Sequence, residues 1–135
     1  MKAKNLLGLD IGTRRIGVAV ANSSIKIAIP LTTIEVNDGD EILQINKIIV
    51  NEKINTIVAG LPRNMSGEET AQSVYTKEFL ENFKLSVNEI KFQDESLTSV
   101  QAENILKSYK KPYTKGDIDM QAAAIILQDY LEENF

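Results

Sequence analysis

Two short apolar segments at the start of the chain, joined by a very short link, constrain the fold most strongly. Residues 5–10 (NLLGLD) and residues 16–21 (IGVAVA) are both predicted to be strands, because each is a short apolar run. The link between them contains Gly12, Thr13, Arg14 and Arg15. A link of this length predicts an antiparallel hairpin, so the chain is expected to begin with a sheet.

The rest of the chain alternates between strand-like and helix-like patterns. We expect three more strands, at residues 25–36 (with Pro30 at a bend or edge position), 55–59 and 87–92. We expect four helices. The first begins at residue 40, the second runs from a Ser66–Glu69 capping box to about residue 84, the third runs from a Thr98–Gln101 capping box to about residue 110, and the last spans residues 117–133. This order predicts an α/β fold: a five-stranded mixed sheet, a three-strand meander followed by alternating helices and strands, with helices on both faces.

The length and composition favour one domain over residues 1–135. The chain shows no internal repeat or linker, and 43% of its residues are hydrophobic, enough for an ordinary core. No apolar run approaches the roughly 18–20 residues that a membrane span needs. The basic N-terminus is followed by charged residues, so it does not resemble a signal peptide, and we expect a cytoplasmic protein.

The absence of cysteine and histidine narrows the chemistry. It excludes disulfides, zinc fingers, a thiol nucleophile and a Ser-His-Asp triad. A metal site would have to be built from oxygen ligands, which favours Mg²⁺ or Mn²⁺. The net charge of −4 argues against a protein that coats nucleic acid through bulk positive charge, although it allows a local basic rim.

Asp10 is the first candidate for a catalytic carboxylate. It ends an apolar strand, where a charge is costly unless it is paired or binds a metal. Gly12, two residues on, would let another backbone or a phosphate approach closely. Asp10 could equally begin the hairpin turn as a purely structural residue.

Asp94 and Glu95 follow the predicted strand 87–92 and precede a predicted helix. Open α/β sheets bind ligands at the carboxyl ends of their strands, and a helix N-terminus favours anions. We favour Glu95 as the second site residue, although either carboxylate could instead serve only the helix N-terminus.

The third candidate is Asp119, near the start of the last helix. Ala122 and Ala123 lie three and four positions later, so the same helix face is small and could pack close to the sheet. Asp117 fits a structural role in an acidic first turn better than Asp119 does. Three carboxylates from three elements would suit two-metal phosphoryl chemistry, which needs no histidine base.

The three arginines of the chain, Arg14, Arg15 and Arg63, all fall in predicted loops near these carboxylates. Arginine suits bidentate contact with phosphate, so all three are candidate substrate-binding residues. Each could equally be solvated loop charge, and Arg15 could instead pair with a carboxylate of the sheet. Lys111 and Lys115, with Lys107 and Lys110, could form the basic rim, although such a run is more often only a solvated face.

Four segments of the chain, in order, resemble motifs of the YqgF (RuvX) family. They are residues 7–20 (LGLDIGTRRIGVAV), 60–67 (GLPRNMSG), 94–99 (DESLTS) and 118–123 (IDMQAA). Ser96 stands where the family usually has arginine, and Asn22 where it often has an acidic residue. Neither position is a proposed metal ligand.

The resemblance implies an RNase H-like fold and a metal-dependent phosphodiester hydrolase that uses Mg²⁺ or Mn²⁺. Asp10, Glu95 and Asp119 would be its catalytic and metal-binding residues. The implied function is a nuclease that processes pre-16S ribosomal RNA in ribosome biogenesis, on the ribosomal precursor particle. The alternative substrate is branched DNA, with the protein acting as a Holliday junction resolvase. Such a resolvase would normally be a symmetric dimer, and we expect a monomer or weak homodimer here.

Two further classes compete with the nuclease. Residues 10–13 (DIGT) also resemble the phosphate loop of sugar kinases and actin-like ATPases, but those proteins need two such domains around the nucleotide. A non-catalytic RNA-binding module is the other rival. It would have no reason to cluster three carboxylates.

Overall fold

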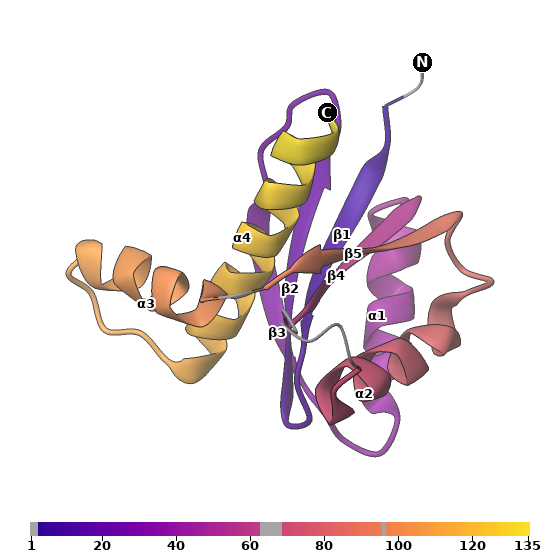
Figure 1. Ribbon diagram of the computed structural model, residues 1–135, viewed down its shortest axis with the longest axis horizontal. Coiled ribbons are helices and arrows are strands. Elements are labelled where there is room, and N and C mark those ends of the chain that lie inside the picture. Colours follow the sequence, from indigo (N-terminus) through magenta and orange to yellow (C-terminus); the bar gives the residue numbers. More distant parts are fainter. Residues whose placement is uncertain (1–2, 63–68, 96) are drawn as a thin grey trace.

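The computed structural model describes residues 3–62, 69–95 and 97–135. Its five strands form one sheet in the order β3-β2-β1-β4-β5 (Figure 1). The strands are β1 (Asn5–Ile11), β2 (Arg15–Asn22), β3 (Ile29–Glu35), β4 (Thr56–Leu61) and β5 (Glu89–Asp94). The helices are α1 (Asp40–Asn51), α2 (Ala71–Leu80), the short 3₁₀ helix η1 (Glu81–Phe83), α3 (Thr98–Ser108) and α4 (Lys115–Asn134).

The predicted α/β architecture is confirmed. β1, β2 and β3 form the antiparallel meander, while β4 runs parallel to β1 and β5 runs parallel to β4. Helix α4 covers one face of the sheet, and α1 and α2 cover the other (Figure 1). Among the described residues no helix, α4 included, is long and apolar enough to cross a membrane.

The alternation of side chains along β1 decides which face Asp10 joins. Leu7 and Leu9 belong to the hydrophobic core that α1 and α2 cover. Leu6 belongs to the second core, under α4, and Gly8 touches α4 as well. Because successive side chains point to opposite faces of a strand, Asp10 lies on the α4 face with Leu6 and Gly8.

Helix α4 lies unusually close to the sheet because glycines face it. A Cβ atom on Gly8 would stand 2.8 Å from the Cβ of Leu127. A Cβ atom on Gly17 would stand only 1.9 Å from the backbone oxygen of Asp119. No side chain fits at Gly17, so the first turns of α4 rest on the backbone of β2.

The third strand begins later than the sequence suggests, so the expected start at residue 25 is wrong. The carbonyl of Asn22 accepts hydrogen bonds from the N–H groups of Ile25 and Lys26, at 3.2 and 2.9 Å, and closes a turn. Lys26 adopts a left-handed φ of 61°. The apolar–polar alternation therefore runs through a turn that side-chain pattern alone does not reveal. Pro30 lies in the edge strand β3, as expected.

The expected helix start at Ser66 is also wrong. Ser66 itself lies outside the described residues, but Glu69 and Thr70 are not helical and α2 begins at Ala71. Thr70 and Ser73 form the capping box, each side chain bonded to the backbone N–H of the other. Two serine or threonine signals lie close together here, and the second one starts the helix.

The last two helices begin differently from one another. At α3 the expected Thr98–Gln101 capping box is wrong: Leu97 precedes the helix in a left-handed conformation, and the hydroxyl of Thr98 donates to the carbonyl of Glu95. At α4 Thr114 and Asp117 form a capping box. Asp117 therefore has the structural role expected of it.

The close contact at Gly17 gives a first prediction. Gly17→Ala should lower the free energy of unfolding by roughly 1–3 kcal/mol, because α4 must move away from β2 to admit the methyl group. Gly116→Ala is the matched control, since its Cβ would meet neighbouring atoms only at 3.6 Å, an ordinary contact. Urea unfolding of both variants measures the difference. Equal stability of the two would show that α4 does not depend on Gly17.

Candidate active site

Asp10 and Glu95 come together across an intervening strand. β4 lies between β1 and β5, and the β1–β4 register pairs Leu9 with Ala59, which puts Asp10 beside Gly60. A Cβ atom on Gly60 would stand 2.7 Å from Oε2 of Glu95. The missing side chain of Gly60 is therefore what lets Glu95 reach over β4 to Asp10.

The register of β5 explains why Glu95 occupies this position. Gln93 pairs with Gly60 in the parallel β4–β5 ladder, and its side chain bonds to Glu133 of α4. The N–H of Glu95 donates to the carbonyl of Leu61 at 3.0 Å and extends the ladder by one residue. Strand alternation then places Glu95 on the α4 face of the sheet with Gln93, and Asp94 on the opposite face.

Asp10 and Glu95 share a hydrogen bond in which Glu95 is the donor. Burial raises the pKa of Glu95 to about 8, helped by the negative charge of Asp10 and the hydrogen bond to it. Burial and the negative charge of Asp119 raise the pKa of Asp10 to about 6, while the hydrogen bond from Glu95 works in the opposite direction. Near neutral pH the pair therefore holds one proton between its two carboxyl groups.

Asp119 lies beside this pair but has a different partner. Its Oδ2 accepts a hydrogen bond from Nε of Arg15 at 2.6 Å, in an ion pair that is partly buried. Arg15 therefore pairs with a carboxylate of α4 and not with one of the sheet. Among residues 3–62, 69–95 and 97–135 no three acidic side chains lie close enough together to hold one metal ion.

The donor atoms at the site still suit a hard divalent cation. Asp10 and Glu95 offer carboxylate oxygens in direct contact, and Gly60 leaves the space in which Glu95 lies. Mg²⁺ and Mn²⁺ favour oxygen ligands of this kind. Asp119 acts on this pair through its negative charge, which raises the pKa of Asp10.

The candidate substrate-binding residues are spread around the hairpin and the start of α4. Arg14 is exposed and, with Thr13, Arg15, Glu35 and Val36, lines a cavity of about 310 Å³. Lys111 and Lys115 are exposed in the loop before α4 and at its first residue. Arg63 lies outside the described residues.

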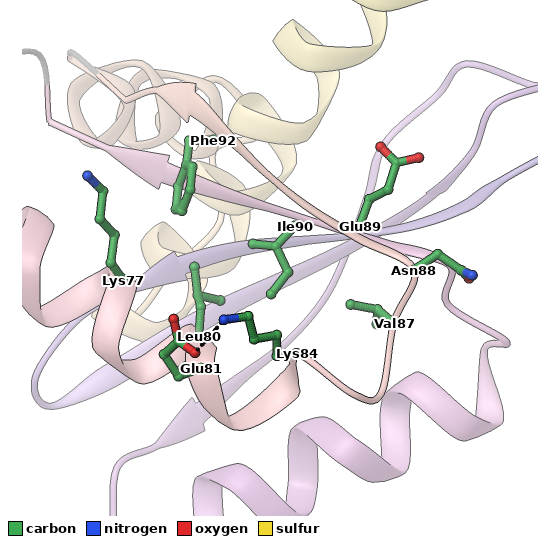
Figure 2. A pocket seen from close by; sticks show the side chains of 9 residues that line it. All are labelled: Lys77, Leu80, Glu81, Lys84, Val87, Asn88, Glu89, Ile90 and Phe92. Carbon is green, nitrogen blue, oxygen red and sulfur yellow. Dashed lines mark ion pairs between the residues drawn. The ribbon is translucent and has the colours of Figure 1, made fainter.

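A separate groove of about 410 Å³ lies between α2, η1 and β5. Leu80, Ile90 and Phe92 contribute to its lining, on the sheet face opposite to α4 (Figure 2). Its Lys84 is paired with Glu81 at 3.2 Å. The groove therefore contains no part of the acidic site.

Solved structures identify the fold. T. thermophilus RuvC in complex with Holliday junction substrate matches with a TM-score of 0.60 at 12% identity, over 96% of this chain and 94% of that one. The yeast mitochondrial Holliday junction resolvase Ydc2 matches with a TM-score of 0.52 at 14% identity, over 97% of this chain and 81% of that one. The predicted RNase H-like fold is confirmed.

Sequence relatives identify the family. Residues 4–133 match the family described as "RuvX: Holliday junction resolvase". A protein of Sulfurihydrogenibium sp. named "Putative pre-16S rRNA nuclease" is 48% identical over 94% of this chain and 89% of its own length. A Synechocystis sp. protein of the same name is 41% identical over 93% of this chain and 86% of its own. The chain belongs to the RuvX family, as its motifs suggested.

Family and fold together make the chain a nuclease, a hydrolase of phosphodiester bonds in nucleic acid. Nucleases of this kind depend on divalent metal ions, which agrees with the all-oxygen donor set of Asp10 and Glu95. The kinase-like reading of residues 10–13 receives no support from the family or from the fold matches.

Sequence reasoning missed three residues that position the acidic side chains. Gly60 and Gly17 make room for Glu95 and for the backbone of Asp119, and Gln72 of α2 donates to the carbonyl of Ile11 at the end of β1. A glycine inside an apolar strand is a known signal of close backbone approach, so both glycines could have been found. The contact of Gln72 has no comparable signal in the sequence.

The shared proton gives a second prediction, for the protein in EDTA. Unfolded carboxyl groups release their protons near pH 4, whereas the folded pair keeps one up to about pH 8. The folded state then binds more protons, so the free energy of unfolding falls as pH rises through this window. Glu95→Gln, which keeps a neutral donor, should flatten this fall in urea unfolding measured at several pH values. Glu52→Gln, at an exposed site after α1, is the control. Parallel curves for wild type and Glu95→Gln would contradict the shared proton.

Proposed function

We propose that the chain is a Mg²⁺- or Mn²⁺-dependent nuclease of the cytoplasm that processes the end of pre-16S ribosomal RNA during ribosome biogenesis. One observation carries the catalytic part of this proposal: Asp10 and Glu95, 85 positions apart in the sequence, are hydrogen-bonded to one another beside Gly60. A buried pair of acids with raised pKa values is costly to keep without a use. The names of the relatives support the ribosomal substrate.

Asp10 and Glu95 would hold the metal, with Asp119 as the third ligand. The bound metal would supply a nucleophile from water and stabilise the leaving oxygen of the cleaved bond. The ligands must be ionised to bind it, so the proton shared by Asp10 and Glu95 has to leave on binding. Gly60, which leaves room for Glu95, and Gly17, which admits the backbone of Asp119, would position two of these ligands.

Arg14, Lys111 and Lys115 would bind the phosphates that flank the cleaved bond. All three are exposed, and Arg14 lines the cavity at the hairpin, one residue from the partner of Asp119. Arg63 keeps its proposed role from the sequence alone. Contacts of this kind position the strand without reading its sequence.

Holliday junction resolution is the second candidate function. The family description and the junction-bound T. thermophilus RuvC favour it. That structural match has only 12% identity, however, whereas the relatives named for pre-16S rRNA reach 48%. A resolvase also needs two matched sites, and so a symmetric dimer, to make paired cuts. We therefore rank ribosomal RNA first.

The third prediction tests catalysis and substrate together. A pre-16S rRNA fragment and a four-way DNA junction are incubated separately with the protein and Mg²⁺ or Mn²⁺. Asp10→Asn should slow cleavage by at least ~100-fold, the upper range for residues that merely orient metal ligands. Chelator should have the same effect on wild type.

Neighbouring carboxylates provide the matched control. Glu95→Gln should lose activity as Asp10→Asn does, whereas Asp94→Asn should keep most of it, since Glu95 is hydrogen-bonded to Asp10 and strand alternation places Asp94 on the opposite face of the sheet. Preferential cutting of the junction would favour the resolvase. Intact function of Asp10→Asn in cells would favour the non-catalytic RNA-binding module.

Substrate binding gives the fourth prediction. Arg14→Gln should raise KM with little change in kcat, because it removes a phosphate contact made equally in the ground and transition states. The slope of log affinity against log salt concentration should fall by about 1. Lys47→Gln, at an exposed position of α1, is the control, because it removes the same charge. An unchanged salt slope for Arg14→Gln would remove Arg14 from the binding surface.

A further inference from the structure

The ion pair between Arg15 and Asp119 joins two parts of the site that sequence places 104 positions apart. Nε of Arg15 lies 2.6 Å from Oδ2 of Asp119, and the two side chains are only 32% and 22% exposed. The guanidinium is permanently charged and has no acceptor capacity. The guanidinium of Arg15 therefore binds the carboxylate of Asp119, which the proposed metal site needs as its third ligand.

Asp119 lies near enough to Asp10 to act on it, although in the described part of the chain the three carboxylates are not grouped around one point. Its negative charge already acts on Asp10 and raises the pKa of that residue. Its backbone oxygen rests on Gly17, which fixes α4 against β2. Because the backbone of Asp119 is held there, we expect its carboxylate to change partner by rotation of the side chain.

A second acceptor for Arg15 lies on the neighbouring strand. Arg15 and Glu35 are direct partners in the β2–β3 ladder. Both line the cavity of about 310 Å³ beside the hairpin, with Thr13, Arg14 and Val36. When the guanidinium leaves Asp119, it can therefore move into this cavity and pair with the carboxylate of Glu35.

We propose that Arg15 is a positioning residue that holds Asp119 apart from Asp10 and Glu95 until a divalent cation binds, and that it then exchanges Asp119 for Glu35. This inference rests on the metal-binding role of Asp10 and Glu95 proposed above. The guanidinium supplies one positive charge to Asp119 in the absence of metal, and so limits the repulsion among three neighbouring carboxylates. The cation supplies two charges and takes over that role.

The exchange makes the ion pair a competitor of metal binding. Mn²⁺ alone is titrated by calorimetry into wild type, Arg15→Gln, Asp119→Asn and the double variant. Removing the competitor should lower the Kd for Mn²⁺ about fivefold in Arg15→Gln, the size of one partly exposed ion pair. In the Asp119→Asn background the same change should alter the Kd less than about twofold, because no pair is left to break.

Two controls separate the ion pair from the general loss of a positive charge. Arg14→Gln removes the same charge one residue away, outside the pair, and should change the Kd less than about twofold. Glu35→Gln removes the second acceptor and should raise the Kd. A Kd that rises in Arg15→Gln, or changes equally with and without Asp119, would overturn the exchange.

The proposed function and the exchange fail in different ways. Absence of Mn²⁺ binding by wild type, or binding that survives Asp10→Asn, would overturn the metal site and the proposed function with it. Normal binding by wild type, lost in Asp10→Asn but unaltered in Arg15→Gln, would overturn the exchange alone.

An observation on wild type does not require any variant to fold well. The chain has three arginines, so its ¹⁵N spectrum contains three Nε–H signals, and loss of one signal in Arg15→Lys assigns Arg15. Saturating Mg²⁺ should shift this signal and speed its hydrogen exchange, as the bond to Asp119 is broken. An Arg15 signal unmoved by Mg²⁺ would overturn the proposal.

Discussion

The close contact between α4 and the sheet determines where every acidic residue of the site lies. Gly17 admits the backbone oxygen of Asp119 to a distance that no side chain would allow, and Gly8 does the same for Leu127. Gly60 removes the side chain that would separate Glu95 from Asp10. Three glycines on three neighbouring strands thus let β1, the end of β5 and α4 place their carboxylates on the same face of the sheet. Any larger residue at these positions would push the donors apart.

The same closeness creates an electrostatic cost that the protein meets in two ways. Asp10 and Glu95 keep a proton between them, and Asp119 takes the guanidinium of Arg15. Both solutions are temporary by nature, since a proton can leave and an arginine side chain can rotate. A permanent solution, such as an apolar replacement for Glu95, would stabilise the fold and remove the donor set. The stability given up here is therefore tied to the chemistry of the site.

How far the sequence predicted this structure depends on how local each interaction is. The hairpin of β1 and β2 and the face of Asp10 follow from short-range alternation, and both were predictable. The start of α2 was not, because a second capping box at Thr70 competes with the pattern at Ser66. The start of β3 was missed for a related reason: the turn at Asn22 is made by backbone hydrogen bonds.

The contacts of the site residues depend even more on non-local packing, which the sequence does not show. The preference for Glu95 over Asp94 agrees with the register that pairs Gln93 with Gly60, but no sequence pattern gives that register. For Arg15 the sequence left two roles open, a contact with phosphate and an ion pair with a carboxylate of the sheet. Its actual partner, Asp119, becomes available only once α4 has packed on Gly17. Sequence thus supplied the candidate residues, while their pairing required the tertiary structure.

The acidic site by itself cannot choose between RNA and DNA, because both present the same phosphodiester to it. Discrimination must come from surfaces around the site. Helix α3 projects from the sheet and packs against α4, and the loop that carries Lys111 connects the end of α3 to the start of α4 (Figure 1). This loop and the hairpin with Arg14 lie on separate elements, so their spacing can select the shape of the bound strand. One such surface on one chain suits the trimming of a single strand, whereas a four-way junction requires two related by symmetry.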